Sequence, residues 1–167
     1  DLSAFKDIVH MDELEFYNAG LTTINLSSLD DVDRLLLNDN SLTSFNLSAL
    51  TTVQDDLHLD QNNLTNVDSL SNLTSVGDEV RLQNNPNLNS VYGLRNLGSF
   101  DDIYLDDINF TTKAPADSAL CTKLSNDINS LRGGAGYYDV CESTAEEQQA
   151  NAQEWLPFFN NHCRENF

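Results

Sequence analysis

Basic residues are scarce in this chain. Its 167 residues include 8 lysines and arginines against 27 aspartates and glutamates, so the formal net charge at pH 7 is −19. Nucleic-acid phosphates and anionic lipids attract lysine and arginine, and this composition therefore excludes simple electrostatic binding to either. The acidity favours a solvated surface suited to a salty exterior, and it is also compatible with cationic partners or divalent ions.

Long apolar runs are missing as well. No stretch approaches the roughly 20 apolar residues that span a bilayer, so we expect no membrane insertion. A length of 167 residues suits one domain of ordinary size or a slim, elongated one. We expect a monomer, or a part of a longer chain.

Cysteine occurs only three times, as Cys121, Cys141 and Cys163, all in the last third of the chain. One disulfide with one remaining thiol is the simplest pairing, and it implies an oxidising compartment. We therefore expect a secreted or cell-surface protein. No Cys-x-x-Cys pair is present and only His162 lies nearby, so the cysteines fit no zinc pattern and we assign no metal site.

What the chain does contain is an internal repeat. Each unit begins with two apolar residues separated by one residue, and successive units start 21, 22, 23 and 23 residues apart. The pairs are Leu14/Phe16, Leu35/Leu37, Leu57/Leu59, Val80/Leu82 and Ile103/Leu105. Further apolar residues recur at matching offsets within each unit, so the repeat extends beyond the pairs.

The repeat predicts an α/β solenoid with short parallel strands and few or no long helices. Alternation at the start of each unit is typical of a strand with one buried face, and 21 to 23 residues make one turn of a solenoid. A single unit cannot bury its apolar face, whereas stacked units share a continuous core. We assign about five repeats to residues 14–110, and residues 1–13 to a partial repeat or N-terminal edge.

The pattern L-x-L-x-x-N-x-L occurs as Leu35, Leu37, Asn40 and Leu42, and again as Leu57, Leu59, Asn62 and Leu64. The chain thereby resembles the leucine-rich repeat family, with internalin-like and receptor L-domain-like short repeats, over residues 8–110. Ala19 and Ile108 depart from the pattern at the asparagine position of the outer units. The resemblance implies that partners bind on a concave face formed by the strands.

The asparagine position has a physical explanation. Where the backbone turns away from the strand, its N–H and C=O groups enter the interior, and an asparagine side chain offers donors and an acceptor to satisfy them. Asn40, Asn62 and Asn85 are therefore expected to form a structural ladder.

After Phe110 the period stops, and residues 111–167 predict a cap of two helices over the last coil. The first helix begins near Pro115, presents Cys121, Leu124, Ile128 and Leu131 on one face, and ends at Gly133. The second runs from about Thr144 to Trp155, after a capping-box pattern at Ser143 and Glu146. A disulfide between Cys121 and Cys141 would staple the first helix to the loop that follows, although Cys141–Cys163 stays open.

Residues that alternate with the buried pairs face outward and form three columns across the strands. The first column contains Glu13, Arg34, Asp56, Glu79 and Asp102; the central column contains Glu15, Leu36, His58, Arg81 and Tyr104; the third contains Tyr17, Asn38, Asp60, Gln83 and Asp106. We expect Tyr17, Leu36 and Tyr104 to be exposed, and tyrosine and arginine are typical interface anchors. The central and third columns are the candidate ligand-binding residues.

These observations predict non-catalytic recognition or adhesion, with a protein or a glycan bound on the concave face. No nucleophile elbow or phosphate-binding loop is present, so we do not expect an enzyme. The alternative is a structural spacer or stalk module without a specific ligand. A minor alternative is ice or glycan binding on a ladder of Thr22, Thr43 and Thr65 with Thr23, Ser44, Asn66 and Ser90 beside it.

Paired aspartates recur between the units, at Asp30/Asp31, Asp55/Asp56, Asp101/Asp102 and Asp106/Asp107. Calcium would need 6–8 oxygen ligands that converge in one place, and the sequence contains no EF-hand or nonapeptide loop to supply them. We interpret the pairs as turn-forming residues and keep calcium as a minor alternative.

Overall fold

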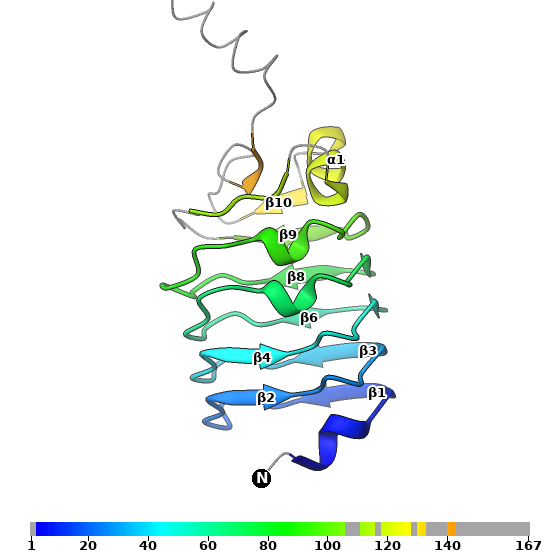
Figure 1. The fold of residues 1–167 in the computed structure, drawn as a ribbon, viewed down its shortest axis with the longest axis vertical. Helices are drawn as coiled ribbons and strands as arrows, with labels where there is room; N and C mark the ends of the chain where they lie inside the picture. Colours follow the sequence, from blue (N-terminus) through cyan, green and yellow to red (C-terminus); the bar gives the residue numbers. More distant parts are fainter. Residues whose placement is uncertain (1–2, 106–110, 116–117, 128–129, 133–139, 143–167) are drawn as a thin grey trace, which may run out of the picture.

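The chain forms a parallel β-solenoid in which short strands and 3-10 turns wind around one apolar core (Figure 1). The structure is a computed structural model, and it describes residues 3–105, 111–115, 118–127, 130–132 and 140–142. In chain order the elements are η1 (Ser3–Asp7), β1 (His10–Glu15), β2 (Thr23–Asn25), β3 (Asp31–Leu36), β4 (Ser44–Asn46), β5 (Thr52–Val53), β6 (Leu57–His58), η2 (Asp68–Leu70), β7 (Ser75–Val76), β8 (Glu79–Arg81), η3 (Tyr92–Leu94), β9 (Asp102–Tyr104), α1 (Ala119–Asn126) and β10 (Leu131–Arg132).

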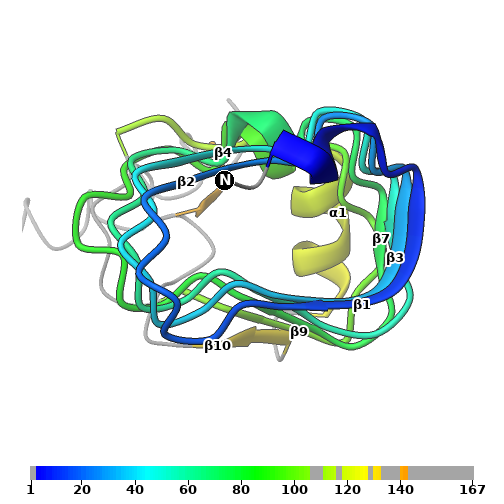
Figure 2. The ribbon, with the colours of Figure 1, turned by 90° about the horizontal axis from the view of Figure 1, so that it is seen from below.

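The main sheet follows one wall of the solenoid and bends around a corner onto the next. Strand β3 makes this bend, because its beginning pairs with β5 while its end pairs with β6. All pairings are parallel, and the order β10-β9-β8-β6-β3 continues past the corner into β5 and β7. Figure 2 shows the corner between β9 and β7, where the coils overlie one another. We call the outward side of β1, β3, β6, β8 and β9 the β-face; it is the side that the sequence analysis expected to be concave.

The repeated apolar pairs occupy equivalent positions in the coils. Leu14 pairs with Leu35, Leu35 with Leu57, Leu57 with Val80, and Val80 with Ile103. The four later members of this series are fully buried, and Leu14, at the end of the stack, is 6% exposed. The predicted solenoid of about five parallel turns is therefore confirmed, because equal spacing along the sequence places equivalent side chains at the same height.

The wall opposite the β-face changes character along the stack. Strands β2 and β4 pair in parallel, with Thr23 opposite Ser44, and the next two coils carry η2 and η3 at this place in the chain order. Asn66 precedes η2 and Ser90 precedes η3, so neither belongs to this two-stranded sheet. Within the described residues, the Thr/Ser/Asn ladder proposed from the sequence has a regular strand backbone over two coils only.

Asparagine side chains join the backbone of neighbouring coils. Nδ2 of Asn62 donates to the carbonyl oxygen of Leu37 in the preceding coil at 3.0 Å and to that of Leu59 in its own coil at 3.1 Å. Its Oδ1 accepts from the N–H of Leu42 at 2.9 Å. Asn40 and Asn85 make the corresponding bonds one coil earlier and one coil later. The carbonyls of Leu37 and Leu59 each accept from two asparagines, so the bonds form a continuous series through the stack.

The C-terminal end differs from the expected two-helix cap. Helix α1 starts after Ser118, whose hydroxyl oxygen accepts from the N–H of Cys121 at 3.2 Å, and it ends at Asn126. Leu131 was expected on this helix, but it lies in β10, which pairs in parallel with β9 and adds a strand to the main sheet. The chain gains more hydrogen bonds by continuing the sheet than by extending the helix. The second predicted helix lies outside the described residues.

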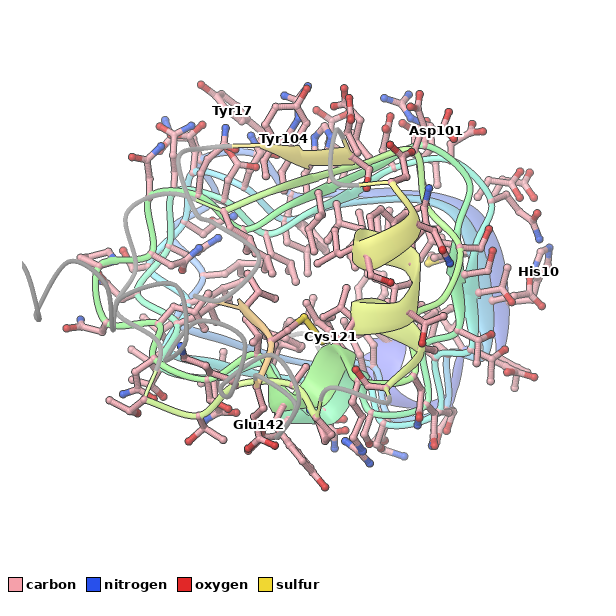
Figure 3. The ribbon with its side chains drawn as sticks, turned by 90° about the horizontal axis from the view of Figure 1, so that it is seen from above. His10, Tyr17, Asp101, Tyr104, Cys121 and Glu142 are labelled. Carbon is pink, nitrogen blue, oxygen red and sulfur yellow. A yellow bond between two sulfur atoms is a disulfide. The ribbon has the colours of Figure 1, made fainter. Side chains whose placement is uncertain are left out.

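The last coil is held by the disulfide between Cys121 and Cys141, which the sequence favoured without deciding. Both cysteines are buried, and Ala114 forms a parallel bridge with Cys141 (Figure 3). Cys163 lies outside the described residues. At the other end of the stack, the Phe5 ring of η1 packs edge-on against Phe16 at 5.8 Å. In the part of the chain that the structure describes, no helix has the length and apolar character to cross a membrane.

The asparagine series gives a stability prediction. Asn62→Asp keeps the size of the side chain and its acceptor, but it replaces the Nδ2 donor with a second oxygen that faces the carbonyls of Leu37 and Leu59. We expect a loss of at least about 2 kcal/mol of unfolding free energy, because buried acceptors are left unpaired. Urea unfolding of Asn66→Asp is the matched control: Asn66 is exposed and its Oδ1 accepts from Asp68, so the change should stay within about 0.5 kcal/mol. Equal losses in the two variants would contradict the role of the series.

Candidate functional site

The β-face brings the central column of candidate residues into register. Glu15 lies opposite Leu36, Leu36 opposite His58, His58 opposite Arg81, and Arg81 opposite Tyr104. In Figure 3, Tyr17 and Tyr104 both extend outward from this side of the molecule. The backbone of Arg132 in β10 continues the same row beside Tyr104, a position that the sequence analysis assigned to the helical cap.

Two of the candidate residues are less accessible than expected. Leu36 is only 8% exposed, so the expectation that it offers an exposed apolar group is wrong. Glu15 and His58 flank it in register and shield this short side chain from water. Asp60 in the third column is 5% exposed, whereas Tyr17 is 60% exposed. Asn38 and Gln83 are half-buried, and Asp106 lies outside the described residues.

Arg81 is the centre of a polar network on this face. Its Nε donates to Oε2 of Glu79 at 2.7 Å, and Nη2 contacts the same oxygen. The guanidinium carbon lies 5.3 Å from the centre of the Tyr104 ring, and the Tyr104 hydroxyl donates to Oε1 of Glu79 at 3.4 Å. Arg81 is therefore held both by an ion pair and by an aromatic ring, which restricts its orientation on the sheet.

A second arginine links carboxylates of neighbouring coils in the first column. Nη1 of Arg34 donates to Oε1 of Glu13 at 3.0 Å, and its Nε lies 3.5 Å from Oδ2 of Asp56. The two arginines thus stand among several carboxylates. This arrangement leaves the face acidic overall while giving it two fixed positive groups.

His58 lies between carboxylates from two coils. Its Nε2 is 3.8 Å from Oδ1 of Asp56 and 3.9 Å from Oε2 of Glu79, and this buried nitrogen has no hydrogen-bond partner. Burial lowers the pKa of His58, and the positive charge of Arg81 lowers it further, while Asp56, Asp60 and Glu79 oppose the shift. The imidazole is consequently neutral near pH 7, with a lone pair available to a ligand.

The sequence analysis placed Asp56, His58 and Glu79 in their columns but did not join them into one cluster. The three residues come from two neighbouring coils, and ligand atoms from all three lie within 4.8 Å of one another. Column positions alone contain the signal, since Asp56 and Glu79 are successive members of the first column and His58 is beside them in the central column. Recognising it requires the register between strands, because no local spacing motif links the residues.

An acidic row borders the β-face at the corner of the sheet. The backbone N–H of Asp55 donates to Asp33, that of Asp78 to Asp55, and that of Asp101 to Asp78, so these residues repeat from coil to coil. Figure 3 shows Asp101 at the corner between the β-face and the side that carries His10. Loss of solvation raises the pKa of Asp78, and the negative charges of Asp56, Glu79, Asp101 and Asp55 add to the rise.

Comparison with known proteins finds no matching family model, no matching curated protein and no matching solved structure. The functional argument therefore depends on the geometry of the chain itself.

The acidic row predicts a dependence of stability on pH. Because the folded pKa of Asp78 is raised above its ordinary value of 3.8, its charge opposes folding once the pH exceeds that value. Asp78→Asn should therefore raise the Tm at pH 7. The gain should shrink at high salt, which screens the repulsion, and vanish below pH 3.8, where the carboxyl is neutral in both states.

Thermal melts of Asp68→Asn provide the control for this prediction, because Asp68 is an exposed carboxylate that begins η2, away from the acidic row. We expect no gain in Tm from this change. A gain that is the same for both variants would point to net charge rather than to the row.

Proposed function

We propose that this chain is a non-catalytic recognition domain that binds a protein or a glycan on its β-face. The observation that carries the proposal is the network around Arg81, in which one arginine is fixed by Glu79 and stacked on Tyr104 at the middle of a row of in-register side chains. Arginine and tyrosine are enriched among the residues that dominate binding energy, and fixing them beforehand lowers the entropy lost on binding.

The proposed solenoid type is a leucine-rich repeat. Support comes from the L-x-L-x-x-N-x-L pattern together with the position of its asparagines, whose side chains bridge the carbonyls of successive coils. A β-face of parallel strands is the surface that the resemblance associates with partner binding. Secretion or display at the cell surface is part of the proposal, and a disulfide in the last coil is consistent with it.

The chemistry of the face indicates what kind of partner it suits. Carboxylates outnumber the arginines, so a partner with basic or hydrogen-bond-donating groups is favoured by electrostatic complementarity. Tyr17 and Tyr104 supply aromatic surface at opposite ends of the row (Figure 3). Such rings can pack against sugar rings or apolar side chains, while the carboxylates accept hydrogen bonds from hydroxyl groups.

A spacer without a ligand is the competing function. A spacer needs a solvated, charged surface but has no use for a half-buried histidine whose nitrogen lacks a partner, or for an arginine held in one orientation. The unpaired Nε2 of His58 and the buried, unpaired Oδ1 of Asp60 carry an energetic cost on this face. That cost favours recognition over a purely structural role, because functional sites are where such costs are retained.

The proposal predicts that the double substitution His58→Ala with Arg81→Ala weakens partner binding at least about tenfold, the size expected when central anchors are removed. Partners would be identified by glycan-array screening and by affinity capture from the native surroundings, and affinity then measured by surface plasmon resonance. The melting temperature should stay close to that of the unchanged chain, since neither residue belongs to the apolar core.

Arg95→Ala is the matched control for this double variant. Arg95 also stacks on a tyrosine, with its guanidinium carbon 4.5 Å from the Tyr92 ring, but it follows η3 away from the β-face. Binding should survive this change. Undiminished binding by the double variant, or a loss confined to Arg95→Ala, would remove the β-face as the recognition surface, and absence of any partner would favour the spacer.

A further inference from the structure

Three metal-ligating side chains converge on the β-face from two neighbouring coils. His58 ends β6 and Asp56 directly precedes this strand, while Glu79 begins β8. One ligand atom from each residue lies within 4.8 Å of the other two. All three side chains are shielded, with exposures of 19% for Asp56, 15% for His58 and 22% for Glu79. The cluster is thus set into the face rather than spread over it.

The distances around His58 fit an ion better than a hydrogen bond. Nε2 lies 3.8 Å from Oδ1 of Asp56 and 3.9 Å from Oε2 of Glu79, and it is buried without a partner. Hydrogen bonds between such atoms require about 2.7–3.2 Å, so neither contact is one. Ligands that bind the same ion at about 2.0–2.2 Å stand about 3–4 Å apart, which is the separation seen here.

Outer contacts orient the two carboxylates. Arg34 lies 3.5 Å from Oδ2 of Asp56, which leaves Oδ1 toward His58. The hydroxyl of Tyr104 donates at 3.4 Å to Oε1 of Glu79, whose other oxygen lies toward His58. Ligating carboxylates in metal sites commonly have such hydrogen-bonding partners, because they fix the orientation of the ligand.

We propose that Asp56, His58 and Glu79 bind one divalent transition-metal ion, with Zn²⁺ as the representative of its class. An imidazole nitrogen with carboxylate oxygens suits zinc and its neighbours, whereas calcium and magnesium prefer ligand sets made of oxygen alone. Three protein ligands leave a coordination position open to water or to a group from a partner. The site does not depend on the proposed recognition function, because it uses residues of this chain only.

Arg81 opposes the ion and makes the proposal testable in two directions. Its guanidinium binds Oε2 of Glu79, the same oxygen that lies toward His58. A cation at the cluster must share this oxygen with Arg81 or displace it. Removing the guanidinium should therefore strengthen metal binding, whereas removing the imidazole should weaken it.

The test is calorimetric titration of the full chain with ZnCl₂ at neutral pH, combined with a scan of its 3 histidines. We expect one site that is distinctly tighter than the background of surface carboxylates. His58→Gln should weaken this site at least about tenfold, the effect typical of losing a group on which a metal site depends. Arg81→Gln should strengthen it several-fold.

His10→Gln and His162→Gln are the controls. His10 also faces two carboxylates, but Nδ1 contacts Asp31 while Nε2 lies 3.8 Å from Asp12, so its partners diverge from one another. Both control variants should keep the tight site. Its loss in either of them, its persistence in His58→Gln, or weaker binding by Arg81→Gln would overturn the assignment.

Cobalt provides a second readout that is independent of folding stability. Co²⁺ bound at this site should give visible absorption that disappears in Glu79→Gln as well as in His58→Gln, while the far-ultraviolet circular dichroism stays unchanged. Absorption that persists in both folded variants would show that the ion binds elsewhere. Partner binding is measured separately, so a failure of this site leaves the recognition proposal standing, and the reverse also holds.

Discussion

Buried carbonyl groups at the turn after each β-face strand are the constraint on which the stack depends. Each strand ends where the backbone turns inward, and its last carbonyls have no partner in a sheet. Asn40, Asn62 and Asn85 satisfy them, and each side chain reaches both its own coil and the preceding one. The same bonds that meet this local requirement therefore fix the height of one coil on the next.

A fixed height has consequences for the surface. Leu35, Leu57 and Val80 meet in register beneath the sheet, and the outward residues beside them must then meet in register above it. This is why Asp56, His58 and Glu79 lie together although 23 residues of sequence separate the first from the last. A slip of one residue would turn these side chains inward and the leucines toward water, so core packing and site geometry are specified by the same alignment.

The surface is also shaped by repulsion. Stacking identical units places like charges above one another, as in the aspartate row that contains Asp78 and Asp101. On the β-face Arg34 and Arg81 interrupt this pattern and bind carboxylates of the first column. An acidic solenoid thus needs a few well-placed cations to hold its sheet face together, and those cations become the most ordered polar groups available to a partner.

The sequence by itself determined the repeat, the parallel strands, the buried leucine pairs and the positions of the outward columns. These features follow from periodicity, because each coil must present the same apolar set to the shared core. Contacts between coils were beyond it. The burial of Leu36 depends on its flanking neighbours, and the close approach at Gly77, where an added Cβ would lie 1.7 Å from the carbonyl oxygen of Gln54, depends on the spacing of two coils.

The end of the solenoid shows the same division between sequence and tertiary structure. Apolar spacing around Cys121 and Leu124 predicted a helix, and α1 is there. The same spacing extended the helix to Leu131, where β9 instead offers an open strand edge that β10 completes. Helical periodicity is a local property of the chain, whereas an unpaired strand edge exists only once the preceding coils have folded, so only the tertiary structure decided where the helix ends and the sheet resumes.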